Sequence, residues 1–252
     1  MKETEEKSTI EGRNPVWEAL RAELPLDKIL VSETARREPL GKIFALAKQS
    51  GVPVQTVRPQ KLAELAETEA SQGIVAVCAA ARYAQVDELL VHAEEKGRPP
   101  FLIIADEITD PHNLGAIIRT ANAAGADGVI ISKNRSAGIG PIVAKTSAGA
   151  VSHTPVARVT NLAQEINRLK ERGLWVTGAD MNGETDLYHS SLTGSIALVV
   201  GSEGKGISRL VREKCDFLVR IPMLGEINSL NASVAAAVMM YEIVRQRMGA
   251  EQ

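Results

Sequence analysis

Three polar clusters, each directly after an apolar run, lie in the last 150 residues of the chain. They span Asp106–Arg119, Gly201–Gly206 and Ile221–Asn231. They combine amides, hydroxyls, carboxylates and a guanidinium with glycines, which let backbone N–H and C=O groups approach a ligand closely. Because open parallel sheets bind ligands at the carboxyl ends of their strands, these clusters predict a ligand site.

The second cluster, Gly201-Ser-Glu-Gly204-Lys-Gly206, has the strongest glycine signal. It is not a P-loop, which needs four residues between its first glycine and Gly-Lys. The order of its glycines also differs from the Rossmann fingerprint. A tight turn with Glu203 exposed is the alternative, but three glycines in six positions exceed what a turn needs and favour ligand binding.

The other two clusters also have a simpler interpretation as helix starts. In the first, Asn113 would cap a helix and Arg119 would be a surface charge. In the third, Ser229 and Asn231 both suit a helix cap, and two candidates are redundant for one cap. At least one of them is therefore expected to serve another purpose.

The amino-acid composition limits the kinds of protein this chain can be. The 252 residues are 44% hydrophobic and 24% charged, which is typical of a folded globular protein, with a net charge of −2. Aromatic residues make up 3%, too few for a base-stacking platform. With no basic excess, nucleic acid would be bound through local patches and shape, and Arg13, Arg36, Arg37 and Lys42 are candidates for phosphate contacts.

Other signals are weak. The four histidines lack metal-site spacing, so no metal site is expected. Cys78 and Cys215 lie in apolar runs and suit a reducing cytoplasm. The charged N-terminus does not resemble a signal peptide, and the longest apolar run, Val234–Tyr241, is far shorter than the ~18 residues of a membrane span. We expect a cytoplasmic protein.

The pattern of elements predicts two α/β domains. Residues 1–8 are expected to be a flexible tail, 9–80 a small α/β domain, 81–100 a linker with Pro99-Pro100, and 101–252 a second domain. The second domain has apolar runs typical of buried parallel strands. Its predicted strands are Phe101–Ala105, Val129–Ser132, Leu174–Gly178, Ile196–Gly201 and Phe217–Ile221. Its predicted helices are Gly115–Ala124, Pro141–Gly149, Leu162–Arg172, Ile207–Lys214 and Leu230–Met248.

Taken in order, the clusters resemble the three motifs of the SpoU (TrmH-type) branch of the SPOUT RNA methyltransferases. The matching residues are Asn113-x-Gly-x-x-x-Arg119, Gly201-x-Glu203-Gly204-x-Gly206, and Ile221-Pro-Met with Ser229-Leu-Asn231. Gly12–Leu20 and Gln72-Gly-Ile74 are similar to the substrate-binding domain of RlmB-like members, which methylate a guanosine ribose in large-subunit ribosomal RNA. Ser71 departs from the histidine of that pattern.

The resemblance implies a fold and a cofactor. The second domain would be a SPOUT α/β trefoil knot around a parallel sheet, preceded by an α/β domain that binds the RNA substrate. The cofactor would be S-adenosylmethionine, contacted by Gly201, Ile221 and Leu230, largely through backbone. Family members are homodimers with the last helix at the interface, in agreement with the alanines at positions 232 and 235–237.

The resemblance also implies catalytic roles. The family assigns activation of the ribose 2′-hydroxyl to the arginine at position 119. A guanidinium is a poor base, so we expect Arg119 to bind the adjacent phosphate and to stabilise charge on the 2′-oxygen. Asn113, Ser229 and Asn231 would orient Arg119 and the ribose. Glu203 would fix the arginine or the loop.

Three alternatives stay open. The enzyme could act on tRNA instead of ribosomal RNA. The chain could be a non-catalytic RNA-binding ribosome assembly factor, although that class need not keep the polar set that is present here. A Rossmann-type nucleotide enzyme is disfavoured because its glycine fingerprint and acidic ribose partner are missing.

Overall fold

The computed structural model describes residues 9–252 except 22, 37, 67–70, 80 and 251–252. The expected tail (1–8) and Arg37 therefore lie outside the described residues. By internal contacts the chain divides into two compact units, with the main boundary between Arg82 and Tyr83. Each unit is described by itself.

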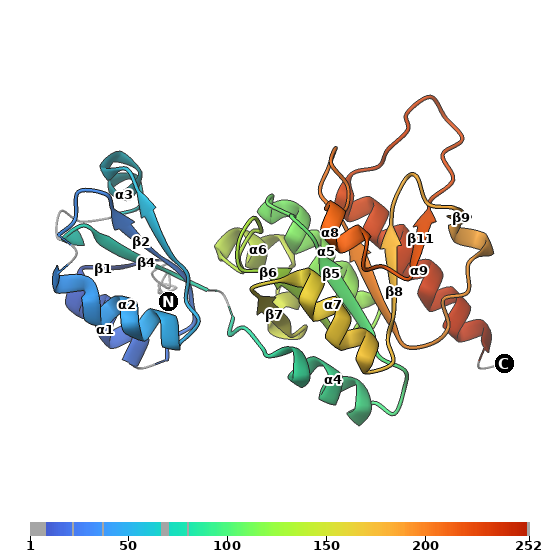
Figure 1. The fold of residues 1–252 in the computed structure, drawn as a ribbon, viewed down its shortest axis with the longest axis horizontal. Coiled ribbons are helices and arrows are strands. Elements are labelled where there is room, and N and C mark those ends of the chain that lie inside the picture. Colours follow the sequence, from blue (N-terminus) through green and yellow to red (C-terminus); the bar gives the residue numbers. More distant parts are fainter. Residues whose placement is uncertain (1–8, 22, 37, 67–70, 80, 251–252) are drawn as a thin grey trace, which may run out of the picture. The chain divides into compact units, whose positions relative to one another are not determined.

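The first unit is a four-stranded sheet with helices on both faces (Figure 1). Its strand order is β1-β4-β2-β3, with β2 and β3 parallel and β4 antiparallel to β1 and β2. Helices α1 and α2 cover one face through Leu20 and Ile43, and α3 covers the other through Leu62. The elements are β1 (Thr9–Glu11), α1 (Arg13–Arg21), β2 (Leu26–Ser32), α2 (Gly41–Gln49), β3 (Val54–Val57), α3 (Pro59–Leu65) and β4 (Ile74–Cys78).

The second unit is built on a seven-stranded sheet in the order β7-β6-β5-β10-β8-β11-β9, and every strand pairing within it is parallel. Its strands are β5 (Phe101–Ala105), β6 (Gly128–Ser132), β7 (Val156–Val159), β8 (Trp175–Ala179), β9 (Thr185–Asp186), β10 (Ile196–Val200) and β11 (Phe217–Arg220). Its helices are α4 (Val86–Glu95), α5 (Pro111–Ala123), α6 (Pro141–Thr146), α7 (Leu162–Glu171), α8 (Arg209–Arg212) and α9 (Ala232–Ala250).

Helices cover both faces of this sheet (Figure 1). Helices α4, α7 and α8 pack on one face, and α9 packs against α5, β8 and β10. All residues of the central strands β5 and β10 are buried, which explains their unbroken apolar sequence. The predicted α/β class, with a parallel sheet preceded by a small α/β domain, is confirmed.

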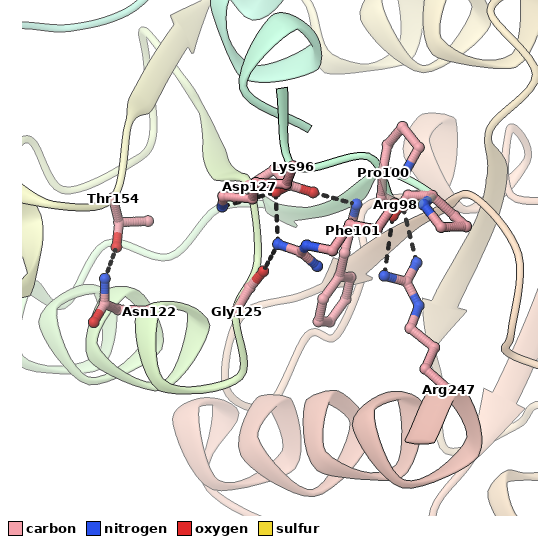
Figure 2. A network of polar contacts seen from close by, with 10 residues as sticks. Lys96, Arg98, Pro100, Phe101, Asn122, Gly125, Asp127, Thr154 and Arg247 are labelled. Atoms are coloured by element: carbon pink, nitrogen blue, oxygen red, sulfur yellow. Dashed lines mark hydrogen bonds and ion pairs between the residues drawn. The ribbon is translucent and has the colours of Figure 1, made fainter. Parts of the chain in front are cut away.

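Most of the segment expected to be a linker, 81–100, groups with the second unit. It carries the helix α4, in which Leu89 and Ala93 are fully buried and Leu89 belongs to the core of that unit. It then leads into a polar network at the amino end of β5 (Figure 2). There the fully buried carboxylate of Asp127 accepts hydrogen bonds from Lys96 (3.0 Å), Arg98 (2.8 Å) and the backbone N–H of Phe101 (2.8 Å).

The same network holds the end of α9. The guanidinium of Arg247 donates to the carbonyl oxygens of Pro99 (3.1 Å) and Pro100 (3.0 Å), as Figure 2 shows. A carbonyl with no partner would be costly at this partly buried position. The amino ends of the strands are thus fastened by charged groups, which leaves the opposite, carboxyl edge to the three motifs.

Within the described residues, no helix is long and apolar enough to cross a membrane. Those residues also contain no group of three or more histidine, cysteine, aspartate or glutamate side chains placed to hold a metal ion. Cys78 and Cys215 are both half-buried and do not form a disulfide, and burial raises the pKa of Cys215 to about 12.

Candidate active site

The three motifs meet where the chain reverses direction across the sheet. From β5 the chain adds β6 and β7 on one side, while β10 and β8 lie on the other side. The carboxyl ends of β5 and β10 are neighbours, because Ala105 pairs with Val200. A crevice at such a reversal is the usual ligand site of parallel sheets. The first two motifs begin here.

The first motif forms the start of α5. Asp110, not Asn113, caps this helix: its carboxylate accepts a hydrogen bond from the backbone N–H of His112 (3.0 Å). Pro111 occupies the first helical position, which suits proline because no hydrogen bond is lost there. The capping interpretation of Asn113 is therefore wrong. Asn113 lies inside the helix, buried, with its side-chain amide available to a neighbouring element.

The second motif is a closed loop that requires glycine at its base. Ser202 and Gly206 exchange two backbone hydrogen bonds (3.1 and 2.9 Å). A Cβ on Gly201 would lie 2.1 Å from the carbonyl carbon of Gly206, so no other residue fits without displacing the loop. Gly204 and Gly206 have positive φ angles (77° and 67°), which glycine adopts without strain.

A buried carboxylate fixes the far end of this loop. Asp106 follows β5, and its side chain accepts a hydrogen bond from the backbone N–H of Ser208 (2.7 Å). Its own N–H donates to the carbonyl of Val200 (2.9 Å), immediately before Gly201. Burial raises the pKa of Asp106, and the hydrogen bond from Ser208 partly offsets that rise. Asp106 therefore connects the first motif to both ends of the second.

The third motif begins α9, and Asn231 is its cap. The side-chain oxygen of Asn231 accepts hydrogen bonds from the backbone N–H groups of Ser233 (2.9 Å) and Val234 (3.3 Å). Its side-chain nitrogen donates to Asn113 (3.0 Å) and also to the carboxylate of Glu203. Asn231 thus joins all three motifs. Ser229, the other candidate for the helix cap, is exposed and does not cap the helix.

A cavity of about 510 Å³ lies beside this junction. The three predicted cofactor contacts all line it: Gly201, Ile221 and Leu230. Glu203 and Ser229 line it too. Asn113, Asn231 and Arg119 do not. The structure therefore brings five of the eight predicted site residues to one cavity and links Asn113 and Asn231 to it through Glu203.

Sequence reasoning missed the wall formed by the loop after β8, where Asp180, Met181 and Asn182 line the cavity. Asp180 accepts hydrogen bonds from the backbone N–H of Asn182 (2.8 Å) and from Arg212 (2.7 Å). A Cβ on Gly183 would lie 2.7 Å from a carbonyl oxygen of β11, so this loop packs tightly. This loop carries no sequence motif. Its position after the carboxyl end of a predicted strand was the one sequence signal that could have placed it at the site.

Arg119 lies six residues after Asn113 on α5, about 9 Å along the helix axis. Its side chain is exposed and forms no hydrogen bond or ion pair with the residues that the structure describes. Helical side chains lean toward the amino end of their helix, which for α5 is the end that carries Asn113. The arginine is therefore a free cation at the margin of the site, available to an anionic ligand.

The model of the SpoU rRNA Methylase family matches residues 100–241, which contain all three motifs. A second model, described as RNA 2′-O ribose methyltransferase substrate binding, matches residues 9–84. The chain belongs to the SpoU rRNA methylase family. Like other SpoU methylases, it is an RNA ribose 2′-O-methyltransferase that depends on S-adenosylmethionine.

Similar proteins agree with this assignment. YacO of Bacillus subtilis, assigned to the TrmH family of tRNA/rRNA methyltransferases, is 48% identical over 94% of both chains. The SpoU methyltransferase AviRb from Streptomyces viridochromogenes, solved with its cofactor AdoMet, is 26% identical with a TM-score of 0.61, covering 96% of this chain and 90% of its own. The A. aeolicus TrmH/SpoU tRNA modifying enzyme is 30% identical with a TM-score of 0.56, covering 61% of this chain and 79% of its own.

The residues of the cavity suit S-adenosylmethionine. Its volume falls within the range of small-molecule sites, roughly 300–1,000 Å³. Ile221, Leu230 and Ala235 give the cavity an apolar surface, and the Gly201–Gly206 loop adds backbone polar groups, so the cavity offers both kinds of surface that a cofactor with an aromatic base and polar groups requires. This SpoU methylase thus has a built cavity at the edge of the sheet where its motifs converge.

Proposed function

We propose that this SpoU methylase transfers a methyl group to the 2′-oxygen of a guanosine ribose in large-subunit ribosomal RNA. The proposal that the chain catalyses this transfer is supported by the hydrogen bonds that Asn231 makes to Asn113 and to Glu203 beside the cavity. The ribosomal part is supported by the match of residues 9–84 to the substrate-binding family. The likeness to a tRNA-modifying enzyme extends over only 61% of this chain.

The two units would divide the work. Residues 9–80 are proposed to bind the RNA substrate, and residues 101–252 to carry out methyl transfer. Gly201, Ile221 and Leu230 would contact the cofactor. When bound, S-adenosylmethionine supplies a methyl group activated by its sulfonium, so the protein must chiefly align and activate the ribose hydroxyl.

Arg119 is proposed as the catalytic residue on the RNA side. A guanidinium stays protonated and cannot accept the hydroxyl proton. It instead binds the phosphate next to the target ribose and stabilises the negative charge that develops on the 2′-oxygen. As the new bond to oxygen forms and the bond from methyl to sulfur breaks, the hydroxyl proton passes to that phosphate or to water.

The remaining predicted catalytic residues are proposed to position these groups. Asn231 and Asn113 hold each other, and Glu203 accepts from Asn231, so the carboxylate fixes the motifs instead of acting as the base. Ser229, exposed at the cavity, is free to contact the ribose.

The active form is proposed to be a homodimer, and the site is proposed to work in the cytoplasm. Helix α9 exposes Val234 (48%), Tyr241 (52%) and Met248 (63%) at intervals of seven residues, which gives one apolar stripe. Ala236, in contrast, is fully buried within the unit and does not form part of that surface. A second copy of α9 would cover the stripe, and the same helix begins at Asn231.

The test compares ribose methylation in cells with and without the gene. All 2′-O-methyl positions in ribosomal and transfer RNA are mapped in both strains. We expect one guanosine in large-subunit ribosomal RNA to lose its methyl group when the gene is absent. Loss in tRNA alone would replace the proposed substrate, and an unchanged map would contradict an active methyltransferase in favour of an assembly factor.

A further inference from the structure

The first unit contains a second cavity, of about 420 Å³, that none of the three motifs uses. It lies beside α2, where the sheet extends past the helix to the edge strand β3. Val31, Val54 and Thr56 form its floor, and the adjacent wall comes from Phe44 and Lys48, which are one turn apart on α2.

The rim of this cavity is a hydrogen-bonded turn. The backbone N–H of Glu33 donates to the carbonyl of Val57 (2.9 Å), and that of Ala35 donates to Ser32 (3.0 Å). The hydroxyls of Ser32 and Thr34 are also bonded to each other (2.8 Å). The backbone that carries Glu33 is therefore held in place before any ligand binds, which reduces the entropy lost on binding.

Two opposite charges line this cavity without neutralising each other. Neither the carboxylate of Glu33 nor the ammonium of Lys48 has a hydrogen-bond or ion-pair partner in the described part of the chain. Both side chains are exposed. The cavity thus offers one acceptor of N–H groups and one cation beside an aromatic ring.

The half-buried ring of Phe44 is unusual in this chain, which has three phenylalanines. Phe101 is buried in the core of the second unit, and Phe217 packs against Trp175 with ring centroids 5.5 Å apart. Phe44 instead faces a cavity. A ring at a cavity, with a carboxylate and a cation near it, matches the chemistry of one nucleotide: a planar base, amino or imino N–H groups, and a phosphate.

We propose that this cavity, hereafter the Phe44 pocket, captures one unpaired nucleotide of the RNA substrate. The base stacks on Phe44, its N–H groups donate to Glu33, and its phosphate contacts Lys48. The inference rests on the proposed function, since it makes the first unit a reader of RNA. A single pocket also explains how a chain with so few aromatic residues selects an RNA: one extruded base supplements recognition by shape.

The experiment measures methyl transfer to total RNA from a strain that lacks the gene, together with photochemical crosslinking of that RNA to the full chain. Phe44→Leu keeps an apolar side chain against the core but removes the aromatic face. Glu33→Gln removes the charge of the rim. The control is Lys61→Ala, which removes an exposed charge on α3, a helix that does not line the pocket.

We expect Phe44→Leu and Glu33→Gln each to raise KM for RNA at least about fivefold, with kcat and cofactor affinity unchanged. Crosslinks should fall in the peptide 42–48 of the wild-type chain, and Lys61→Ala should stay within about twofold of wild type. Wild-type KM in both variants, or no crosslink in that peptide, overturns the pocket while leaving the proposed function intact. A wild-type KM in both variants is also the result expected if the partner of this region were a peptide strand that pairs with the open edge of β3 and not a nucleotide. A wild-type chain that neither crosslinks to nor methylates RNA overturns both proposals.

Discussion

Asn231 donates a hydrogen bond of 3.0 Å to Asn113, a residue 118 positions earlier in the chain. Its side-chain oxygen meanwhile caps α9. The two ends of one amide therefore have separate tasks: the oxygen starts a helix, and the nitrogen joins the first motif to the third and, through Glu203, to the second.

This division can be tested with Asn231→Asp. Aspartate keeps the oxygen that caps α9 but replaces the donor with a second acceptor, facing Asn113 and Glu203. We expect the melting temperature to change little and kcat to fall about 10- to 100-fold, as expected for losing a hydrogen bond to a charged group. Asn161→Asp is the matched control, because Asn161 caps α7 away from the cavity. Wild-type kcat in Asn231→Asp would show that the bridge is not needed.

Gly201→Ala should disrupt the Gly201–Gly206 loop, which lines the cavity proposed to bind the cofactor. The added Cβ would lie 2.1 Å from the backbone of Gly206, so the loop must move. We expect the affinity for S-adenosylmethionine, measured by calorimetry, to fall at least about tenfold. Gly194→Ala provides the control, since a Cβ there meets open space and Gly194 has no positive φ. Equal affinities for the two variants would remove the loop from the cofactor site.

Stability should depend on pH through Asp106. Burial raises the pKa of Asp106 above the ordinary 3.8, so the Asp106 carboxylate binds a proton more tightly in the folded state than in the unfolded state. The cost of the buried charge is therefore absent below pH 3.8 and fully present once the pH exceeds the raised pKa. Asp106→Asn keeps an oxygen for Ser208 and carries no charge at any pH.

Unfolding in urea at several values from about pH 4 to about pH 7 checks this linkage. As the pH falls, the wild-type free energy of unfolding should rise relative to that of Asp106→Asn. A difference that is constant with pH, or that changes with the opposite sign, would show that Asp106 has no raised pKa.

Tyr241→Glu should separate the proposed dimer. A charge in the middle of the apolar stripe of α9 would have to be buried against the second copy, at considerable cost. We expect sedimentation to show at least tenfold weaker association, about 1.4 kcal/mol, and methyl transfer to fall with it. Tyr188→Glu, at a similarly exposed tyrosine outside α9, should leave both the association and the methyl transfer unchanged. A wild-type chain that sediments as a monomer would refute the dimer.

Some strands of the fold could be predicted from the sequence and others could not. Strands β5 and β10 were predictable because they are buried on both faces and therefore apolar throughout. Strands β1, β7 and β9 were missed, since none exceeds four residues and no long apolar run reveals them. The trefoil knot stays a prediction of the resemblance.

Some parts of the candidate site could likewise be predicted from the sequence, and others could not. Gly201, Ile221 and Leu230 were expected to contact the cofactor because of the family resemblance, and all three line one cavity. The bridge from Asn231 could not be predicted, because its partners are set by how α5 and α9 pack. Asp180 was missed because its role depends on Arg212 and on a loop without a motif.

Arg119 is proposed to serve the RNA and not the cofactor, and Arg119→Ala tests this role most directly. One preparation is used for calorimetry with S-adenosylmethionine and for single-turnover methyl transfer to RNA from a strain lacking the gene. Arg168→Ala, which removes an exposed arginine on α7, is the control. We predict cofactor affinity within about threefold of wild type and a transfer rate lower by about 10²–10³-fold in Arg119→Ala alone. A wild-type rate in Arg119→Ala, or a loss of cofactor affinity as large as the loss of rate, would contradict the account.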